Sequence, residues 1–286
     1  MTLKGEAPAK INLSLEVLGK RSDGFHEVRM LMAGVSLADQ LSFKAAPDLR
    51  LTCDLPGMDC GEDNLILRAA RSLQKATGCK AGAHIALKKR IPLGGGLAGG
   101  STDAAAALKG LNELWSLGLS REALRKIGAT FGSDIPFCID SGWALATGRG
   151  EKLLPLSLRR KLHFVLLNPG FEVSTKWVYQ SLGRLPQNRP NLSRAAFDAL
   201  EAGDEAALAK AAVNDLESVT AARYKEIGLL KEALLAEGAQ LSRMSGSGPS
   251  VWGLFKNENA AKIAQKALNG KVALALTVST IGRLKN

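Results

Sequence analysis

The sequence is poor in the residues from which metal sites, disulfide frameworks and base-stacking surfaces are built. Its 286 residues include 4 cysteines and 3 histidines, and no two cysteines have the C-x-x-C spacing. We therefore expect neither a protein-held metal nor a disulfide framework, and a reducing, cytoplasmic setting. Aromatic residues make up only 5%, which is few for a platform that stacks nucleic-acid bases.

Long apolar runs are missing as well. No stretch approaches the roughly 18 apolar residues of a membrane span, and residues 1–10 have no apolar core of a secretory signal. We expect no membrane partner and no export. The hydrophobic share of 46% and the charged share of 23% are those of a globular protein. The length favours two domains.

Basic residues exceed acidic ones, which gives a net charge of +11 and a pI near 9.6. Such an excess suits nucleic acid or a small polyanion such as a nucleotide. The basic residues are dispersed, however, and the longest cluster, Lys88-Lys89-Arg90, directly precedes a glycine-rich stretch. We interpret most of the charge as solvated surface and expect no nucleic-acid partner.

Periodicity indicates the class of fold. Apolar residues alternate with polar ones over 11–17, which predicts a half-buried strand with Lys10, Asn12 and Ser14 on its polar face. Asp63 is the expected N-cap of a helix that follows it. Strands and helices are interspersed without a regular βαβ repeat, so the class is α+β.

A domain junction is expected within 153–160, because this stretch carries a proline and paired arginines after a strand-like segment. It divides the chain into residues 1–155 and residues 156–286. The first part holds the glycine-rich stretch, and the second part holds a largely helical region followed by two short strands.

Residues 91–103 read Ile-Pro-Leu-Gly-Gly-Gly-Leu-Ala-Gly-Gly-Ser-Thr-Asp and open a helix that we expect to begin near Asp103. Glycines let the backbone approach an anion closely, and a helix N-terminus adds its dipole. Ser101 and Thr102 contribute hydroxyl donors, and Lys89 lies just upstream. A plain surface turn is the alternative, but a turn does not need five glycines followed by hydroxyls. The pattern predicts a phosphate cradle.

Two familiar phosphate motifs do not fit this loop. G-x-G-x-x-G runs from Gly94 to Gly99, but the buried strand before it and the acidic residue that should follow a second strand are missing. The P-loop spacing starts at Gly95 but has Ser101 where that motif needs lysine. We also expect a larger side chain at Gly96 to collide with a bound phosphate and to leave the fold intact.

Three separated segments share order and composition with a known group of enzymes. Residues 7–13, 92–104 and 242–250 together resemble the GHMP kinase superfamily. Residues 21–26 and 132–136 are similar to its branch that acts on a cytidyl substrate in the non-mevalonate route of isoprenoid biosynthesis. The resemblance implies a ribosomal-protein-S5-like N-terminal domain and a ferredoxin-like C-terminal domain. It also implies transfer of the ATP γ-phosphoryl to the substrate's tertiary 2-hydroxyl, with Mg²⁺ carried in on ATP.

The resemblance also implies roles for single residues. It makes Asp134 the catalytic base and Lys10 the residue that orients and stabilises the hydroxyl. It implies ATP contacts at Asn64, Lys89, Pro92, Leu93, Gly94, Gly95, Gly96, Leu97, Ala98, Gly99, Gly100, Ser101 and Thr102. It implies substrate contacts at Asn12, Phe25, His26 and Thr175, with His26 reading the cytosine edge. Phe25 stands where these enzymes commonly have tyrosine, so stacking is kept and a hydroxyl hydrogen bond is lost.

Simpler interpretations stay open beside these. Taken alone, Lys10 is a solvated charge at a strand edge, Asp134 a turn residue and His26 a surface histidine. One alternative function is a kinase of the same superfamily with another small alcohol as acceptor. A second is an RNA-binding protein, suggested by the pI. The expected partners are ATP and a small cytidyl substrate, and the sequence leaves monomer and homodimer undecided.

Overall fold

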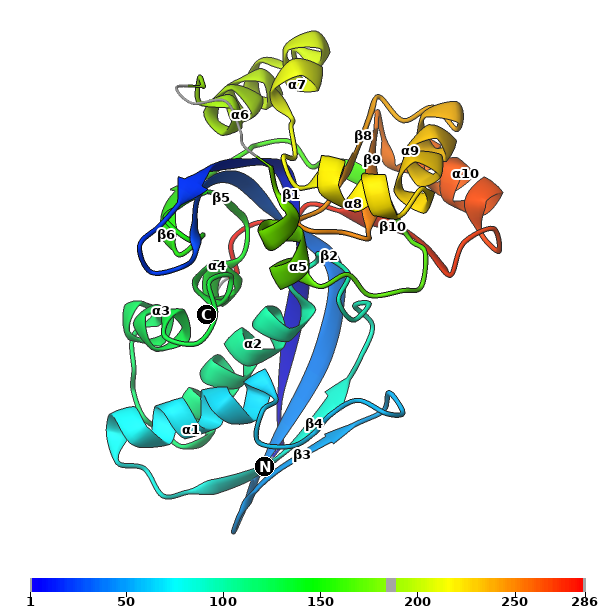
Figure 1. Ribbon diagram of the computed structural model, residues 1–286. Coiled ribbons are helices and arrows are strands. Elements are labelled where there is room, and N and C mark those ends of the chain that lie inside the picture. The colour runs from blue at the N-terminus through cyan, green and yellow to red at the C-terminus, as the bar shows by residue number, and fades with distance from the viewer. Residues whose placement is uncertain (1, 184–188, 285–286) are drawn as a thin grey trace.

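The computed structural model describes residues 2–183 and 189–284 and contains two sheets flanked by helices (Figure 1). The first sheet is six-stranded, with the order β3-β4-β2-β5-β6 and β1 paired to β2. Its strands are β1 (Thr2–Lys20), β2 (His26–Ala46), β3 (Leu49–Cys53), β4 (Gly82–Lys88), β5 (Trp143–Thr147) and β6 (Lys152–Leu156). Its helices are α1 (Leu65–Thr77), α2 (Gly99–Leu114), α3 (Arg121–Ala129) and α4 (Ile135–Asp140).

The second sheet is antiparallel and has the order β10-β7-β9-β8. Its strands are β7 (His163–Asn168), β8 (Leu241–Met244), β9 (Val251–Phe255) and β10 (Leu274–Ser279). Numbered within the sheet, this order is 4-1-3-2, with helices between the first and second strands and between the third and fourth. The expected ferredoxin-like topology of the C-terminal half is thereby confirmed.

The helices of the second half are short and lie between the strands of this sheet in the chain. They are α5 (Thr175–Ser181), α6 (Leu192–Ala202), α7 (Glu205–Ala211), α8 (Glu217–Arg223), α9 (Glu226–Ala236) and α10 (Glu258–Leu268). Within residues 2–183 and 189–284, no helix is both long and apolar enough to cross a membrane. β6 ends at Leu156 and β7 begins at His163, so the last residues of the first sheet lie within the expected junction; a boundary after residue 155 stays a prediction.

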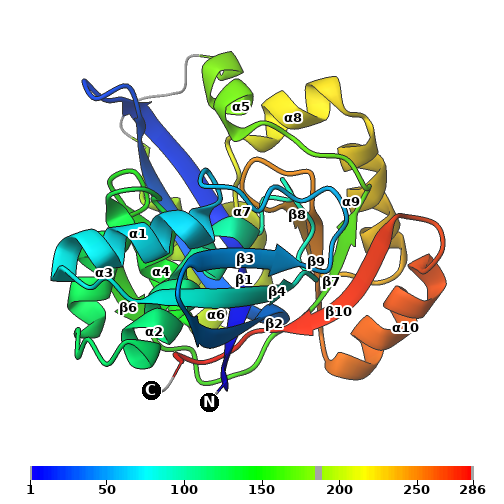
Figure 2. The same cartoon turned by 90° about the horizontal axis from the view of Figure 1, so that it is seen from below.

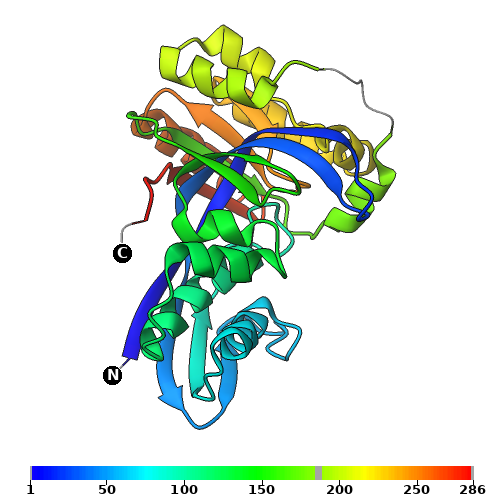
Figure 3. The ribbon, with the colours of Figure 1, turned by 90° about the vertical axis from the view of Figure 1, so that its left-hand side faces the viewer.

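The hairpin of β1 and β2 runs through both halves of the molecule (Figure 3). The expected strand at 11–17 is real but longer, and its polar face is not solvated: Lys10, Asn12 and Ser14 are all buried. The expectation of a half-buried strand was wrong because both faces are covered. α2 packs on β1 from the first half, and α6 packs on it from the second.

Local boundaries depart from the sequence predictions near the site. Asn64, not Asp63, is the N-cap of α1: its backbone is extended and its Oδ1 accepts a hydrogen bond from Ile66 N at 2.9 Å. α2 begins at Gly99, earlier than the expected start near Asp103. The reason is that Ala98 adopts a left-handed backbone, which turns the loop directly into the helix.

The two sheets are joined through a shared core and through polar contacts. One buried cluster includes Ile11 of β1, Phe164 of β7 and Trp252 of β9, and Trp252 Nε1 donates to Asn12 O at 3.0 Å. β10 lies beside β2, with a bridge between Val35 and Thr280 (Figure 2). These contacts hold the two halves in place on either side of the space between them.

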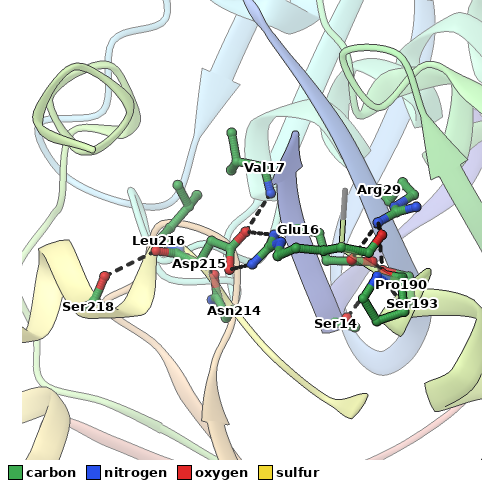
Figure 4. A network of polar contacts seen from close by, with 11 residues as sticks. Ser14, Glu16, Val17, Arg29, Pro190, Ser193, Asn214, Asp215, Leu216 and Ser218 are labelled. Atoms are coloured by element: carbon green, nitrogen blue, oxygen red, sulfur yellow. Dashed lines mark hydrogen bonds and ion pairs between the residues drawn. The ribbon is translucent and has the colours of Figure 1, made fainter. Parts of the chain in front are cut away.

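A polar network anchors the β1–β2 hairpin to the second half (Figure 4). The buried Glu16 carboxylate accepts hydrogen bonds from Arg29 at 2.8 Å and from the Ser193 hydroxyl at 2.9 Å. Asp215 accepts a hydrogen bond from Val17 N at 2.7 Å. These contacts fix the strands that lead to the 21–26 loop.

Candidate active site

A cleft of about 750 Å³ opens between the two halves. All but three of the predicted site residues line it, namely Lys10, Asn12, Phe25, His26, Lys89, Pro92, Leu93, Gly94, Gly95, Gly96, Ala98, Gly99, Gly100, Ser101, Asp134 and Thr175. They come from β1, the 21–26 loop, the residue after β4, the glycine-rich loop, α2, the N-cap of α4 and α5, so the tertiary structure brings together segments that are far apart in the chain. The volume suits a ligand of ordinary cofactor size.

The glycine-rich loop is held between β1 and a second glycine segment, residues 245–250. Lys10 N donates to Leu97 O at 3.1 Å. Ser245 Oγ donates to Gly96 O at 2.9 Å, and Ser250 N donates to Gly95 O at 3.3 Å. These hydrogen bonds fix the position of the loop from both sides, and the rest of the loop faces the cleft.

Gly96 is needed for this arrangement. Its φ is +73°, and a Cβ placed there would lie 2.1 Å from Ser245 O. The expectation that a larger side chain would leave the fold intact was wrong, because that side chain meets the neighbouring backbone before it meets any ligand.

The first turn of α2 faces the cleft through Gly99, Gly100 and Ser101. Ala98 makes no side-chain cap. The leading N–H groups of a helix have no partner within the helix. A helix N-terminus with uncapped N–H groups attracts anions. The predicted phosphate cradle thus has both the backbone and the dipole that it needs.

Three predicted ATP contacts do not line the cleft. Leu97 is a core residue, 1% exposed. Thr102 is fully buried, and its hydroxyl donates to Pro8 O at 2.8 Å, which ties α2 to β1. The Asn64 side chain caps α1 and donates to Asp59 O at 2.7 Å. Their place in the structure is to hold the elements around the cradle.

The predicted catalytic pair lies at the base of the cleft. Lys10 Nζ is 3.7 Å from Asp134 Oδ2 and donates to Asn12 Oδ1 at 2.6 Å. Asp134 is the N-cap residue of α4, the short helix that the sequence did not predict. The Lys10 side chain is 5% exposed and that of Asp134 30% exposed, so the carboxylate faces the opening and the ammonium lies behind it.

Lys89 lies deeper and has different partners. Its ammonium is clamped between the carboxylates of Asp39 and Asp103, with Asp103 Oδ2 at 2.8 Å. Asp39 Oδ1 also accepts from Ile91 N at 2.8 Å. Burial alone would lower the pKa of Lys89, but the charges of Asp103 and Asp39 raise it. Burial raises the pKa of Asp103 to about 7 despite the Lys89 charge.

Sequence reasoning missed Asp39 of β2 and Asp103 as a pair. Asp39 lies in the mixed polar and apolar stretch Ser36-Leu-Ala-Asp-Gln40 of β2, and only the structure shows that it is completely buried. A carboxylate at such a position needs a cation or several N–H donors. Once the burial of Asp39 is known, that requirement explains why Lys89 and backbone N–H groups surround it.

Aromatic rings gather at the other end of the cleft. His26 stacks on Tyr179 of α5, with ring centroids 5.0 Å apart, and the Arg149 guanidinium lies 4.8 Å from the centroid of the Phe25 ring. Burial, followed by the charge of Lys20, lowers the pKa of His26. Tyr179 and Arg149 were missed, because neither belongs to a motif and only the fold places them opposite residues 25–26.

The cleft is electropositive. Lys10, Lys20 and Arg149 line it together with Lys89, whose charge is offset by Asp39 and Asp103, and within the described chain Asp134 is the one carboxylate among its lining residues. Thr175, on the far wall, shares a 2.8 Å hydrogen bond with the Ser247 hydroxyl. In the part of the chain that the structure describes, no group of three or more His, Cys, Asp or Glu side chains could hold a metal ion. The positive charge of the cleft suits polyanionic ligands.

Comparison with known proteins places this fold and site in a class. A family model described as the GHMP kinases N terminal domain matches residues 64–142, and one described as GHMP kinases C terminal matches residues 196–273. The crystal structure of homoserine kinase from Cytophaga hutchinsonii has a TM-score of 0.78 at 19% identity, covers 99% of this chain and 95% of its own, and so shares the fold. The protein is thus a GHMP kinase, an ATP-dependent enzyme of α+β architecture.

Closer relatives narrow the class. The 4-diphosphocytidyl-2-C-methyl-D-erythritol kinase of Gloeobacter violaceus is 44% identical, covering 97% of this chain and 93% of the relative. That of Geobacter sp. (strain M21) is 46% identical over 90% and 91%. A crystal structure of 4-(cytidine 5'-diphospho)-2C-methyl-D-erythritol kinase has a TM-score of 0.83 at 34% identity, over 98% and 100%. The chain belongs to the 4-diphosphocytidyl-2-C-methyl-D-erythritol kinase family.

Proposed function

We propose that the protein transfers the γ-phosphoryl group of ATP to the 2-hydroxyl of 4-diphosphocytidyl-2-C-methyl-D-erythritol, a step toward isoprenoid precursors. One observation carries the proposal. A single electropositive cleft holds a glycine-rich phosphate cradle on one side, an aromatic end on the other, and the Lys10–Asp134 pair, 3.7 Å apart, in the same lining. The relatives at 44% and 46% identity support the choice of substrate.

ATP places its phosphates against the loop from Pro92 to Ser101 in this proposal. Backbone N–H groups of the loop and of the first turn of α2 bind the phosphate oxygens, and the helix dipole adds to the attraction. With Mg²⁺ bound, ATP would have part of its phosphate charge neutralised, and the Ser101 hydroxyl would offer the metal a hard oxygen ligand of the kind it prefers. The protein's main contribution is position and charge.

Asp134 accepts the proton of the attacking hydroxyl, since its carboxylate faces the opening of the cleft. Lys10 stabilises the oxygen as its charge develops, and Asn12 fixes the ammonium through the 2.6 Å hydrogen bond. A tertiary alcohol is hindered and weakly acidic, so both roles are required. Asn12 is itself held from the second half, because its backbone N–H donates to Ser245 Oγ at 3.2 Å.

The cytosine ring binds at the aromatic end. The lowered pKa of His26 keeps the imidazole neutral at pH 7, and a neutral imidazole offers one donor and one acceptor. The cytosine edge presents an amino donor beside a ring-nitrogen acceptor, which is the complementary pair. Phe25, 49% exposed, offers its ring for stacking, and Arg149 holds that ring from the other side.

An assay of ADP release with a panel of acceptor alcohols tests the proposal. The cytidyl substrate, mevalonate, homoserine and a water-only control are each supplied with ATP and Mg²⁺. We expect turnover with the cytidyl substrate at least 100-fold above the others. Comparable rates with mevalonate or homoserine would assign the protein to another acceptor. Asp134→Asn protein serves as the control that any ADP released comes from this cleft.

A further inference from the structure

A second cavity, of about 430 Å³, lies between α3, α4 and the β5–β6 strands. Among the described residues, none that lines it also lines the catalytic cleft. The two sites lie at opposite ends of α4: Asp134 precedes this helix at the cleft, and Asp140 ends it at the second cavity. The C-terminal segment passes the same place, where Leu284 N donates to Asp140 O at 2.8 Å (Figure 1).

Cations outnumber anions at one end of this cavity. Three guanidinium groups approach the Asp140 carboxylate: Arg121 at 2.9 Å, Arg283 at 3.2 Å, and Arg125. Burial disfavours the charged carboxylate, but hydrogen bonds from Arg121 and Arg125 outweigh it and lower the pKa of Asp140. One carboxylate cannot neutralise three guanidinium groups, so positive charge is left over beside the cavity. Arginine binds phosphate oxygens in pairs of parallel hydrogen bonds.

The other carboxylates at the rim do not cancel this excess. Glu122 is paired with Lys126 at 2.8 Å. Glu151 pairs with Arg149, whose Nε lies 3.9 Å from Glu151 Oε2, and it accepts a hydrogen bond from Arg149 N at 2.7 Å. Both lie within the cavity lining, yet each is already engaged with a partner other than the Asp140 cluster.

A residue whose hydroxyl has no partner also lines the cavity. Ser141 lines the cavity and is 6% exposed, and its Oγ makes no hydrogen bond within the described residues. A buried polar group without a partner is costly, and such groups in folded proteins call for an explanation. A ligand oxygen in the cavity would supply the missing partner.

The remaining wall is apolar. Its members come from α4, β5 and β6, and they are Phe137, Trp143, Ala144, Leu153, Pro155 and Leu156. Such a wall takes up a hydrocarbon chain by removing it from water. The volume of about 430 Å³ is within the range of small-molecule sites. The cavity lining therefore has charged side chains at one end and apolar side chains at the other.

We propose that this cavity binds an organic phosphate that carries a short apolar chain. The phosphate lies against Arg125 and Arg283 and accepts a hydrogen bond from Ser141 Oγ, and the chain lies along the apolar wall. Because the cavity and the catalytic cleft share no lining residue, the ligand binds together with ATP rather than in its place.

Calorimetric titration of the full chain tests this with hexyl phosphate as the probe. Hexanol and inorganic phosphate are titrated separately, to measure the affinity of the apolar wall and of the arginine end of the cavity alone. We expect hexyl phosphate to bind at least tenfold more tightly than either, with the same affinity when the catalytic cleft is saturated with a non-hydrolysable ATP analogue. Displacement by the analogue would place the probe in the catalytic cleft and overturn the proposal, as would equal affinity for inorganic phosphate.

Two variants locate the site. Arg125→Gln with Arg283→Gln removes two positive charges while Arg121 still pairs with Asp140, and we expect at least tenfold weaker binding. Arg50→Gln with Lys75→Gln removes the same charge from exposed positions on β3 and α1. This control should bind hexyl phosphate as tightly as the wild type does. Equal loss of affinity in both double variants would show that net charge alone governs binding, and it would overturn the proposed site.

Ser141→Gly keeps every charge, and glycine suits the φ of +53° at this residue. This variant tests the proposal even if the double variant Arg125→Gln with Arg283→Gln fails to fold. We expect several-fold weaker binding of hexyl phosphate, and an unchanged affinity would overturn the proposal. The ADP-release assay of each variant separates this outcome from the proposed kinase function, because none of these residues lines the catalytic cleft.

Discussion

Lys10 and Lys89 are buried lysines of the same cleft, and their surroundings differ in one decisive respect. Lys10 has one carboxylate at 3.7 Å and one amide oxygen within hydrogen-bond distance. Lys89 lies between two buried carboxylates, and one of them, Asp39, also accepts backbone N–H groups. An ammonium group has three N–H donors. Lys10 keeps donor capacity for a ligand, whereas the charge of Lys89 is already offset by its carboxylate partners.

The same residue type therefore serves two different roles in one cleft. The Lys89 region ties the end of β4 and the first turn of α2 to β2, which holds the glycine-rich loop in place. Lys10 is tied to that loop only through its backbone, and its side chain lies behind the Asp134 carboxylate. Chemistry is expected at the first lysine and loop positioning at the second.

The largest expected effect tests the Lys10 region. Asp134→Asn keeps the shape of the residue and removes the base, so turnover should fall by about 10²–10⁴-fold while both substrates still bind. Lys10→Ala should act in the same way. The double variant should be much less impaired than the product of the two losses, because both residues act on one hydroxyl. Steady-state kinetics with titrated binding measures this, and a fully active Asp134→Asn enzyme would remove the assignment.

The next effect tests the Lys89 region through stability. Lys89→Met leaves two buried carboxylates without their cation, and loss of one partner of a buried pair costs about 3–5 kcal/mol. Lys10→Met is the matched control, since its partner Asp134 is 30% exposed and should cost no more than about 1 kcal/mol. Urea unfolding of both variants measures the difference. Equal losses would erase the distinction between the two lysines.

A pH series sharpens the same comparison. The folded pKa of Asp103 is about 7, above its unfolded value near 3.9, so the folded protein holds the proton more tightly. The stability from this group is therefore present at low pH and is lost as pH rises toward and through about 7. Between pH 5 and pH 8, the wild type should lose about 1–3 kcal/mol more than Asp103→Asn. Parallel stability profiles would show that Asp103 is ionised throughout.

The smallest effect lies at the aromatic end, away from both lysines. Phe25→Ala should remove roughly 1–3 kcal/mol of stacking, seen mainly in the Michaelis constant for the cytidyl substrate with ATP handling nearly unchanged. Phe25→Tyr is the control and should be active, because it keeps the ring. Equal loss for both substrates would indicate a folding defect rather than loss of base recognition.

The sequence predicted which loop lines the cleft, because local chemistry alone defines that loop. Five glycines before Ser101 predict a backbone that approaches an anion, and the structure places them at the cleft. Thr102 was predicted with them but faces β1, because α2 starts at Gly99 and the helical repeat turns its side chain away. The start of a helix next to glycines depends on the neighbouring backbone and was not readable from the loop itself.

The sequence by itself determined the α+β class, the glycine-rich cradle and, through resemblance, the segments that meet at the cleft. Those properties follow from residue type and spacing, which act over a few neighbours. The tertiary structure decided that β1 is buried on both faces, that Lys89 is enclosed by Asp39 and Asp103, and that Tyr179 meets His26. Burial and pairing depend on contacts between distant segments. Only the packing of the two halves determines which charged side chains stay in contact with water and which are buried.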